Sequence, residues 1–284
     1  MSDRLDLPWQ SGDRPLNLTL EPYDAPAGPV EGALRSASVL RRSTEWTAKP
    51  ARAEAAFAVL QDRLGPDRLV WAVGLRDDRP AWELYVYNGA AASPISPSEL
   101  RRAWGGAVTW TPGLVQTVES LGGVDPWSVD LDPATLEGSS SVVAFNGYVN
   151  AGAEAALSYR ITTDGPRLTN LYRRFPSSER KAIVRAASRT LHLAGIDRVA
   201  HLEPADHLEV HLAQKPDCDG VYWVGVPTVQ AVEVCLAADP SGRVADLLGP
   251  DLDRLGHLRF DVGIDVERNG SELRIRKVAI YGVL

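Results

Sequence analysis

The sequence predicts an α+β protein in which helices flank one large antiparallel sheet. Two segments, residues 207–212 and 258–267, alternate strictly between apolar and polar side chains, which is the pattern of a strand with one buried and one polar face. The other strand candidates come in pairs joined by short turns, and helical segments separate the pairs. Strands joined by tight turns pair antiparallel, so the pattern excludes the parallel sheet of a dinucleotide-binding fold.

Composition and charge limit the class of protein. The chain has 284 residues, 44% of them hydrophobic, and a net charge of −7. This length suits one large domain, and the acidic balance argues against non-specific binding to nucleic acid or anionic membranes. No apolar run approaches the roughly 18 residues of a membrane span, and residues 1–15 lack the apolar core of a signal peptide. We therefore expect a cytoplasmic protein.

The N-terminal part differs in composition from the rest of the chain. Proline and glycine punctuate it, and residues 16–20 are its one short strand candidate. We expect a single domain in which residues 1–50 form an arm or lid and residues 51–284 form the body.

The body begins with a helix and a strand pair. Residues 51–64 carry apolar residues at helical spacing, and Gly65-Pro66 ends the pattern. The predicted strands are residues 69–75 and 82–87. The second strand places Glu83, Tyr85 and Tyr87 together on one face.

The middle of the chain repeats this unit of helices and paired strands. The predicted helices are residues 98–104, 112–121 and 178–194, and the predicted strands are residues 142–149, 155–162 and 168–172. The strand 155–162 places Arg160 on the same face as Ala156 and Ser158.

The C-terminal part adds further strands. They are residues 207–213, 221–226, 230–237, 258–267 and 273–281, with a short helix at residues 243–248. About ten strands result, and a sheet of that size with every helix on one face either stays open or closes into a barrel with a polar lumen. We predict the barrel, surrounded by helices, because closure removes the unpaired edges.

Two stretches of this predicted barrel resemble a known family. Residues 144–160, AFNGYVNAGAEAALSYR, resemble the central hairpin of the ABBA-type prenyltransferases, and residues 261–283, DVGIDVERNGSELRIRKVAIYGV, resemble their terminal hairpin. The cyanobactin peptide prenyltransferases are the most similar members, and the resemblance runs from residue 69 onward. It implies a helix-ringed barrel that moves a prenyl group from a prenyl diphosphate to an aromatic or peptide acceptor in a natural-product pathway.

The resemblance also implies roles for individual residues. Arg160 and Arg276 would hold the diphosphate, while tyrosines on the inner face would shield the allyl cation. The residues themselves suggest the base: in a lined chamber the proton affinity of a carboxylate rises, so Glu209, assisted by His211, would take the proton of the acceptor. The further substrate-binding candidates on the inner face are Tyr85, Tyr87, Tyr281, Glu83, His207, Glu233, Arg259 and Asp261.

The predicted charge of the lumen leaves the function open between two alternatives. With Asp265 added, the inner-face carboxylates outnumber the basic residues, and such a lumen repels a diphosphate unless magnesium bridges them. The first alternative is a prenyltransferase, for which we expect Mg²⁺ as the ion. The second is a relative that has lost the diphosphate site and binds or modifies a cationic or peptidic ligand. Three or more converging Arg or Lys side chains would favour the first alternative, and a carboxylate-lined chamber the second.

The row His207, Glu209 and His211 allows one more interpretation. Imidazole and carboxylate groups on one strand face can converge on a transition metal, whereas most such rows are simply solvated. We therefore predict no dedicated metal site.

Overall fold

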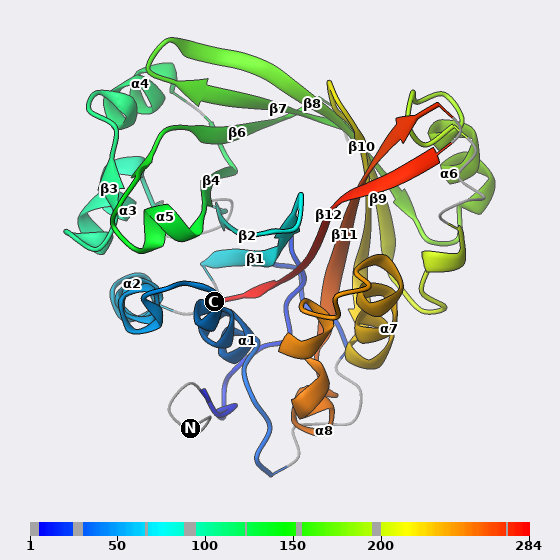
Figure 1. Ribbon diagram of the computed structural model, residues 1–284, viewed down its shortest axis with the longest axis horizontal. Helices are drawn as coiled ribbons and strands as arrows, with labels where there is room; N and C mark the ends of the chain where they lie inside the picture. Colours follow the sequence, from blue (N-terminus) through cyan, green and yellow to red (C-terminus); the bar gives the residue numbers. More distant parts are fainter. Residues whose placement is uncertain are drawn as a thin grey trace.

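A closed antiparallel barrel forms the centre of the molecule. The computed structural model describes residues 6–24, 31–65, 68–87, 95–122, 124–151, 155–194, 200–270 and 272–284. The barrel order is β1-β12-β11-β10-β9-β8-β7-β6-β4-β2, and its ten strands confirm the predicted fold class (Figure 1). The strands are β1 Leu69–Arg76, β2 Arg79–Val86, β4 Trp127–Leu131, β6 Phe145–Asn150, β7 Ala155–Thr162, β8 Gly165–Pro176, β9 Glu209–Gln214, β10 Asp219–Pro227, β11 Arg259–Asn269 and β12 Glu272–Val283.

Helices surround the barrel on its outside (Figure 1). They are α1 Ala37–Ser43, α2 Pro50–Leu64, α3 Pro97–Trp104, α4 Leu114–Leu121, α5 Pro133–Leu136, α6 Arg180–Ala187, α7 Thr228–Ala238 and α8 Leu252–Leu255. Two short strands, β3 Thr109–Trp110 and β5 Ser141–Val142, pair in parallel apart from the barrel. Within the described residues, no helix is long and apolar enough to cross a membrane.

The alternation of side chains makes the barrel apolar outside and polar inside. Trp71, Trp82 and Val262 point outward and are fully buried in the core shared with the helices. A second, smaller cluster containing Ala72 and Tyr281 lies in the lumen. Burying each large aliphatic side chain stabilises the fold by about 1.5–3 kcal/mol, so the helices hold the barrel through its outer face.

A turn of the N-terminal segment reaches into the lumen. Asn17 organises the turn, because its side-chain oxygen accepts hydrogen bonds from the backbone amides of Thr19 and Glu21, each at 2.9 Å. Leu18 and Leu20 pack against the lumen cluster. We call residues 15–22 the N-terminal turn. The predicted strand at residues 16–20 is wrong, because only an isolated bridge between Leu16 and Pro22 forms.

Two errors in the predicted strands compensate each other. Residues 230–237 form helix α7 instead of a strand, since Ala231, Val234, Cys235 and Ala238 recur at helical spacing and are buried. Strand β4 was not predicted, although its Trp127, Val129 and Leu131 alternate with polar residues. The predicted number of barrel strands was therefore right, although residues 230–237 were counted in place of β4.

Other boundaries also differ from the prediction. Helix α6 ends at Ala187, well before residue 194, and β8 extends the short predicted strand to Gly165–Pro176. Strand β9 begins at Glu209, so Leu208 precedes it and is 40% exposed where burial was expected.

Candidate functional site

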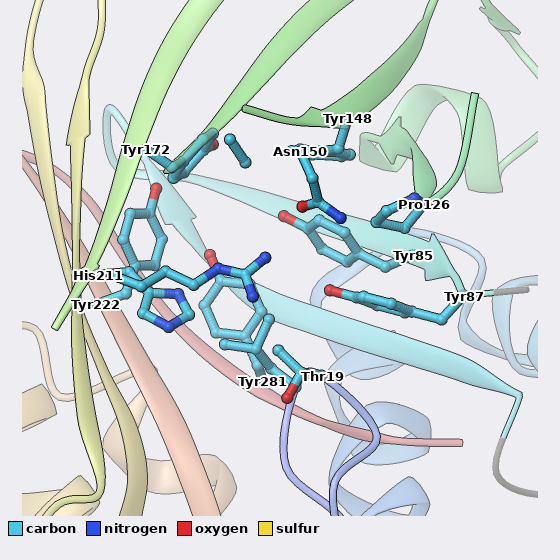
Figure 2. A pocket seen from close by; sticks show the side chains of 13 residues that line it. Thr19, Tyr85, Tyr87, Pro126, Tyr148, Asn150, Tyr172, His211, Tyr222 and Tyr281 are labelled. Atoms are coloured by element: carbon cyan, nitrogen blue, oxygen red, sulfur yellow. The ribbon is translucent and has the colours of Figure 1, made fainter. Parts of the chain in front are cut away.

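Five tyrosines form a closed ring across the lumen (Figure 2). Their adjacent ring centroids lie 6.0–6.2 Å apart all the way round. The members of this tyrosine ring are Tyr85 of β2, Tyr148 of β6, Tyr172 of β8, Tyr222 of β10 and Tyr281 of β12. They come from every second strand in barrel order.

Small residues on the intervening strands make room for the tyrosines. Ala72 lies opposite Tyr281, Ser128 opposite Tyr85, and Ala213 opposite Tyr172 in the strand register. At Gly263 a Cβ atom would come within 2.6 Å of the Tyr222 ring and 3.0 Å of the Tyr281 ring. The alternation of large and small residues therefore determines the ring geometry.

The tyrosine hydroxyls stay uncharged at neutral pH. Burial raises the pKa of each of the five phenols above its ordinary value near 10. The Tyr85 hydroxyl donates to the Glu83 carboxylate, and the Asn170 amide donates to the Tyr172 hydroxyl at 3.1 Å. The ring thus presents neutral aromatic surface to the lumen.

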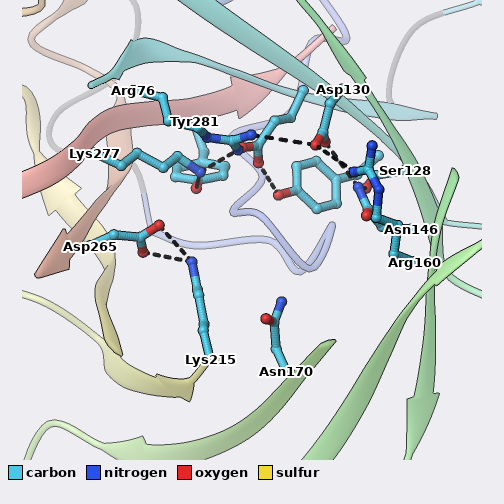
Figure 3. A network of polar contacts seen from close by, with 12 residues as sticks. Arg76, Ser128, Asp130, Asn146, Arg160, Asn170, Lys215, Asp265, Lys277 and Tyr281 are labelled. Carbon is cyan, nitrogen blue, oxygen red and sulfur yellow. Dashed lines mark hydrogen bonds and ion pairs between the residues drawn. The ribbon is translucent and has the colours of Figure 1, made fainter. Parts of the chain in front are cut away.

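Four basic side chains lie on one side of the ring, and we call them the basic layer (Figure 3). Lys277 Nζ donates to Glu83 Oε1 at 2.6 Å and to the Tyr281 hydroxyl at 3.0 Å. Lys215 Nζ donates to both oxygens of Asp265, at 2.7 and 2.6 Å, and to the Tyr222 hydroxyl at 3.0 Å.

The remaining members of the basic layer are arginines near the barrel rim. Arg76 Nη2 donates to Glu83 at 2.7 Å, and its Nη1 lies 3.5 Å from an Asp130 oxygen. Arg160 Nη1 lies 4.0 Å from the same oxygen. The Arg76 and Arg160 side chains are 44% and 43% exposed, so the basic layer opens to solvent at this end.

Neighbouring cations favour the ionised form of two carboxyl groups in the layer. Although burial alone would raise it, the Lys277 and Arg76 cations lower the pKa of Glu83 to about 2. Burial likewise opposes ionisation of Asp265, but Lys215 and Lys277 hold the pKa of this carboxyl below its usual value. Because Asp130 is the third carboxylate, the basic side chains outnumber the carboxylates by one. The acidic excess predicted for the lumen is therefore absent from this layer.

A cavity of about 80 Å³ lies on the opposite side of the ring. Besides the tyrosines, it is lined by residues that include Thr19, Tyr87, Asn150, Arg174 and His211 (Figure 2). His211 Nε2 is 2.9 Å from Glu209 Oε2, and this hydrogen bond lowers the pKa of Glu209. We call this space the tyrosine cavity.

Several of the predicted site residues meet in the lumen. Glu83, Tyr85, Tyr281 and Arg160 line the tyrosine ring and the basic layer, while Tyr87, Glu209 and His211 lie at the tyrosine cavity. Asp261 also faces inward, but protein groups already occupy its carboxylate. It accepts hydrogen bonds from the backbone amides of Leu18, at 2.8 Å, and Gly225, at 2.5 Å. Burial nevertheless raises the pKa of Asp261 to about 7.

Four predicted residues lie elsewhere. Arg276 points out of the barrel to Asp77 and Glu267, because an irregularity between Asp265 and Val266 shifts the register and turns Lys277 inward instead. The others are exposed Glu233 on α7, His207 ahead of β9, and Arg259, which pairs with Asp206 at 2.9 Å.

Sequence reasoning missed the residues that dominate the site. They are Arg76, Lys215, Lys277, Tyr148, Tyr172, Tyr222 and Arg174. Part of the signal was present, since the alternation through Glu209, His211 and Ala213 continues to Lys215. No group of three His, Cys, Asp or Glu side chains suited to a metal ion occurs in the described part of the chain.

The comparisons with known proteins support the fold. No family model matches the sequence, and no curated protein matches it. The NotF prenyltransferase structure has a TM-score of 0.50 at 11% identity, covering 87% of this chain and 91% of that one. The apo form of the prenyltransferase PriB has a TM-score of 0.49 at 14% identity, covering 86% and 93%. PriB in ternary complex with L-tryptophan and dimethylallyl thiolodiphosphate has a TM-score of 0.45 at 12% identity.

At such low identity, similarity of structure speaks for the fold alone. NotF matches over most of both chains, and the order of the strands closes the same kind of barrel with helices outside. The chain therefore has the barrel fold of the ABBA-type prenyltransferases.

Proposed function

We propose that the protein transfers a prenyl group from a prenyl diphosphate to an aromatic acceptor. The observation that carries the proposal is the closed tyrosine ring directly beside the basic layer. Lys215 and Lys277 each donate to a ring hydroxyl, so an anion held by these lysines would place its attached chain against the tyrosines.

The basic layer would bind the diphosphate and stabilise it as the leaving group. A charge-assisted contact is worth about 1.5–3 kcal/mol, so four basic side chains supply useful affinity. The phosphate oxygens would compete with Glu83 and Asp265 for the lysine ammonium groups. This competition weakens binding of the bare diphosphate.

Magnesium would enter with the diphosphate as part of the substrate. The described residues form no protein-made metal site, but Asp130 Oδ2 makes only long contacts, at 3.5 and 4.0 Å, and can bind one further cation. Mg²⁺ is commonly held by one or two carboxylates together with substrate phosphates.

The tyrosine ring would protect the reacting carbon. When the C1–O bond of the donor breaks, its electron pair leaves with the diphosphate and the allyl fragment becomes positive. Aromatic faces attract a cation by about 0.5–2 kcal/mol per ring, and the ring also keeps water away. Neutral phenols suit this role because they do not react with the cation as phenolates would.

The acceptor would lie in the tyrosine cavity. A carbon of its aromatic ring bonds to C1 of the prenyl fragment, and the proton lost from that carbon passes to His211. Glu209, hydrogen-bonded to His211 at 2.9 Å, would stabilise the resulting imidazolium. An aromatic side chain of a peptide could serve as well as a free amino acid, which is consistent with a role in modifying peptide natural products.

A second candidate is a ligand-binding relative that no longer uses a diphosphate. The pairs Lys215–Asp265 and Lys277–Glu83 favour it, because both lysines are satisfied without a ligand. The charge of the basic layer favours the transferase.

Incubation with dimethylallyl or geranyl diphosphate tests the proposal. Aromatic amino acids and short peptides serve as acceptors, and mass spectrometry detects the addition of one prenyl group. We expect product with wild-type protein in magnesium and none with Arg160→Ala, while the exposed-residue control Arg101→Ala stays active. Absence of both product and donor binding in the wild type would leave the second candidate.

A further inference from the structure

A basic groove lies on the outside of the barrel where β8 and α6 meet. The cavity there has a volume of about 280 Å³. Arg173 and Arg174 of β8 and Arg185 and Arg189 at the end of α6 line it. Phe175 and the alanines of α6 give it an apolar floor. We call it the arginine groove.

Among the described residues, the arginine side chains of this groove have no ion-pair or hydrogen-bond partner, although the charge of Arg174 acts on Glu209. None of Arg173, Arg174, Arg185 and Arg189 forms an ion pair or side-chain hydrogen bond within the part of the chain that the structure describes. Several arginines elsewhere are paired, as Arg42 is with Asp6 and Asp251. Like charges gathered at one place repel each other and destabilise the free protein. An anionic ligand would relieve this repulsion and therefore stabilise the protein by binding to the cluster.

The groove adjoins the proposed active site. Arg174 lines both the arginine groove and the tyrosine cavity, and Ala155 of the groove is followed by Ala156 of the cavity on β7. Because Arg174 lies near the end of β8, a chain lying in the groove could pass over the barrel rim there and place one of its side chains in the cavity.

We propose that the arginine groove docks an acidic segment of a peptide or protein acceptor next to its aromatic side chain. The role of the bound segment as an acceptor rests on the proposed function, whereas its binding in the groove does not. Guanidinium groups pair with carboxylates in bidentate fashion, and the apolar floor suits the stems of glutamate side chains.

The charge of the whole chain favours a short acidic segment over a large polyanion. The net charge is −7, so nucleic acid or an anionic membrane would meet repulsion beyond the groove. A peptide only long enough to fill the groove avoids that repulsion.

Fluorescence anisotropy with a labelled peptide tests the docking directly. The probe carries one tryptophan followed by four glutamates, and no prenyl donor is added. The double variant Arg185→Glu, Arg189→Glu reverses two exposed groove charges, and Arg101→Glu, Arg102→Glu reverses two exposed charges at the end of α3 as the matched control. We expect about tenfold weaker binding for the groove variant and little change for the control.

The result must also depend on salt and on peptide charge. Raising the salt concentration should weaken binding to the wild type, and a peptide with glutamines for glutamates should bind poorly. Equal affinity of the groove and control variants for the acidic peptide would overturn the proposal. So would Arg185- and Arg189-dependent binding to anionic phospholipid vesicles in place of the peptide.

The two proposals can fail separately. Groove-dependent peptide binding without any prenyl transfer would leave the docking surface standing and remove the proposed function. Prenyl transfer to free aromatic amino acids, with no groove-dependent binding of the acidic peptide, would support the proposed function and remove the docking surface.

Discussion

Tyr148 gives the most direct test of the tyrosine ring, because among the described residues its hydroxyl makes only a 3.4 Å contact with Ser128. We expect Tyr148→Phe to keep nearly the wild-type rate, since the aromatic face remains. Tyr148→Leu removes one cation–π contact and should slow single-turnover prenyl transfer by about tenfold. Equal loss in both variants would show that the hydroxyl, and not the ring face, matters.

Glu83 should contribute to stability in a pH-dependent way. Its folded pKa of about 2 lies below the unfolded value of 4.5, so the contribution is present above pH 4.5 and is lost as the pH falls toward 2. Glu83→Gln should lower the free energy of unfolding by about 3 kcal/mol at neutral pH and by less at low pH. Urea unfolding of both proteins at neutral and at low pH measures this difference in the free energy of unfolding.

Exposed Glu272 provides the control for this experiment. Glu272→Gln should change the stability little at either pH, since surface charges contribute at most about 1 kcal/mol. A Glu83→Gln variant as stable as wild type at neutral pH would show that Lys277 finds another partner.

Single residues also show why the site was hard to predict. Alternation along a strand correctly placed Glu83, Tyr85 and Tyr281 inside, because β2 and the end of β12 are regular. The same rule placed Arg276 inside instead of Lys277, since one irregularity in the ladder exchanges the two faces. A single sequence gives no signal that predicts such a shift in strand register.

The N-terminal turn is the element on which the floor of the tyrosine cavity depends. Asn17→Ala removes the acceptor for the Thr19 and Glu21 amides, which should cost about 1–3 kcal/mol locally. Hydrogen exchange of residues 15–22 should become faster in this variant. Glu21→Ala, which changes only an exposed side chain of the same turn, should leave exchange unchanged. Unaltered protection in Asn17→Ala would mean that Leu18 and Leu20 hold the turn by packing alone.

Elements were predicted best where local pattern and final environment agree. The strict alternation of residues 258–267 identified β11, and Gly65 marked the end of α2. The strand predicted at residues 230–237 failed because a short apolar run fits either a buried strand or a buried helix. The partners that decide between them are distant in the sequence, as in the packing of α7 on β11.

At the scale of the whole molecule, closure of the barrel creates a site that no local segment contains. The tyrosine ring draws on strands from β2 to β12, so its members are spread over nearly 200 residues and meet only when β12 pairs with β1. The sequence could therefore predict a polar lumen from alternation, while the neighbours within that lumen depended on strand order and register.

Donor binding should therefore stabilise the whole barrel. A ligand at about 100 times its Kd adds about 2.7 kcal/mol to the free energy of unfolding, which corresponds to a Tm increase of roughly 5 °C for a chain of this size. We expect this increase for dimethylallyl diphosphate with magnesium. In EDTA the increase should be small, because Glu83 and Asp265 hold the lysines that the diphosphate needs.

Two variants separate the basic layer from general charge effects in this thermal assay. Arg160→Ala should lose the magnesium-dependent increase, since Arg160 and Asp130 lie together at the open end of the layer. Arg101→Ala removes an exposed positive charge on α3 and should keep it. An equal Tm increase with magnesium and with EDTA would contradict the expected competition. It would mean that the diphosphate displaces the carboxylates from Lys215 and Lys277 unaided, and that the lysines alone bind the donor.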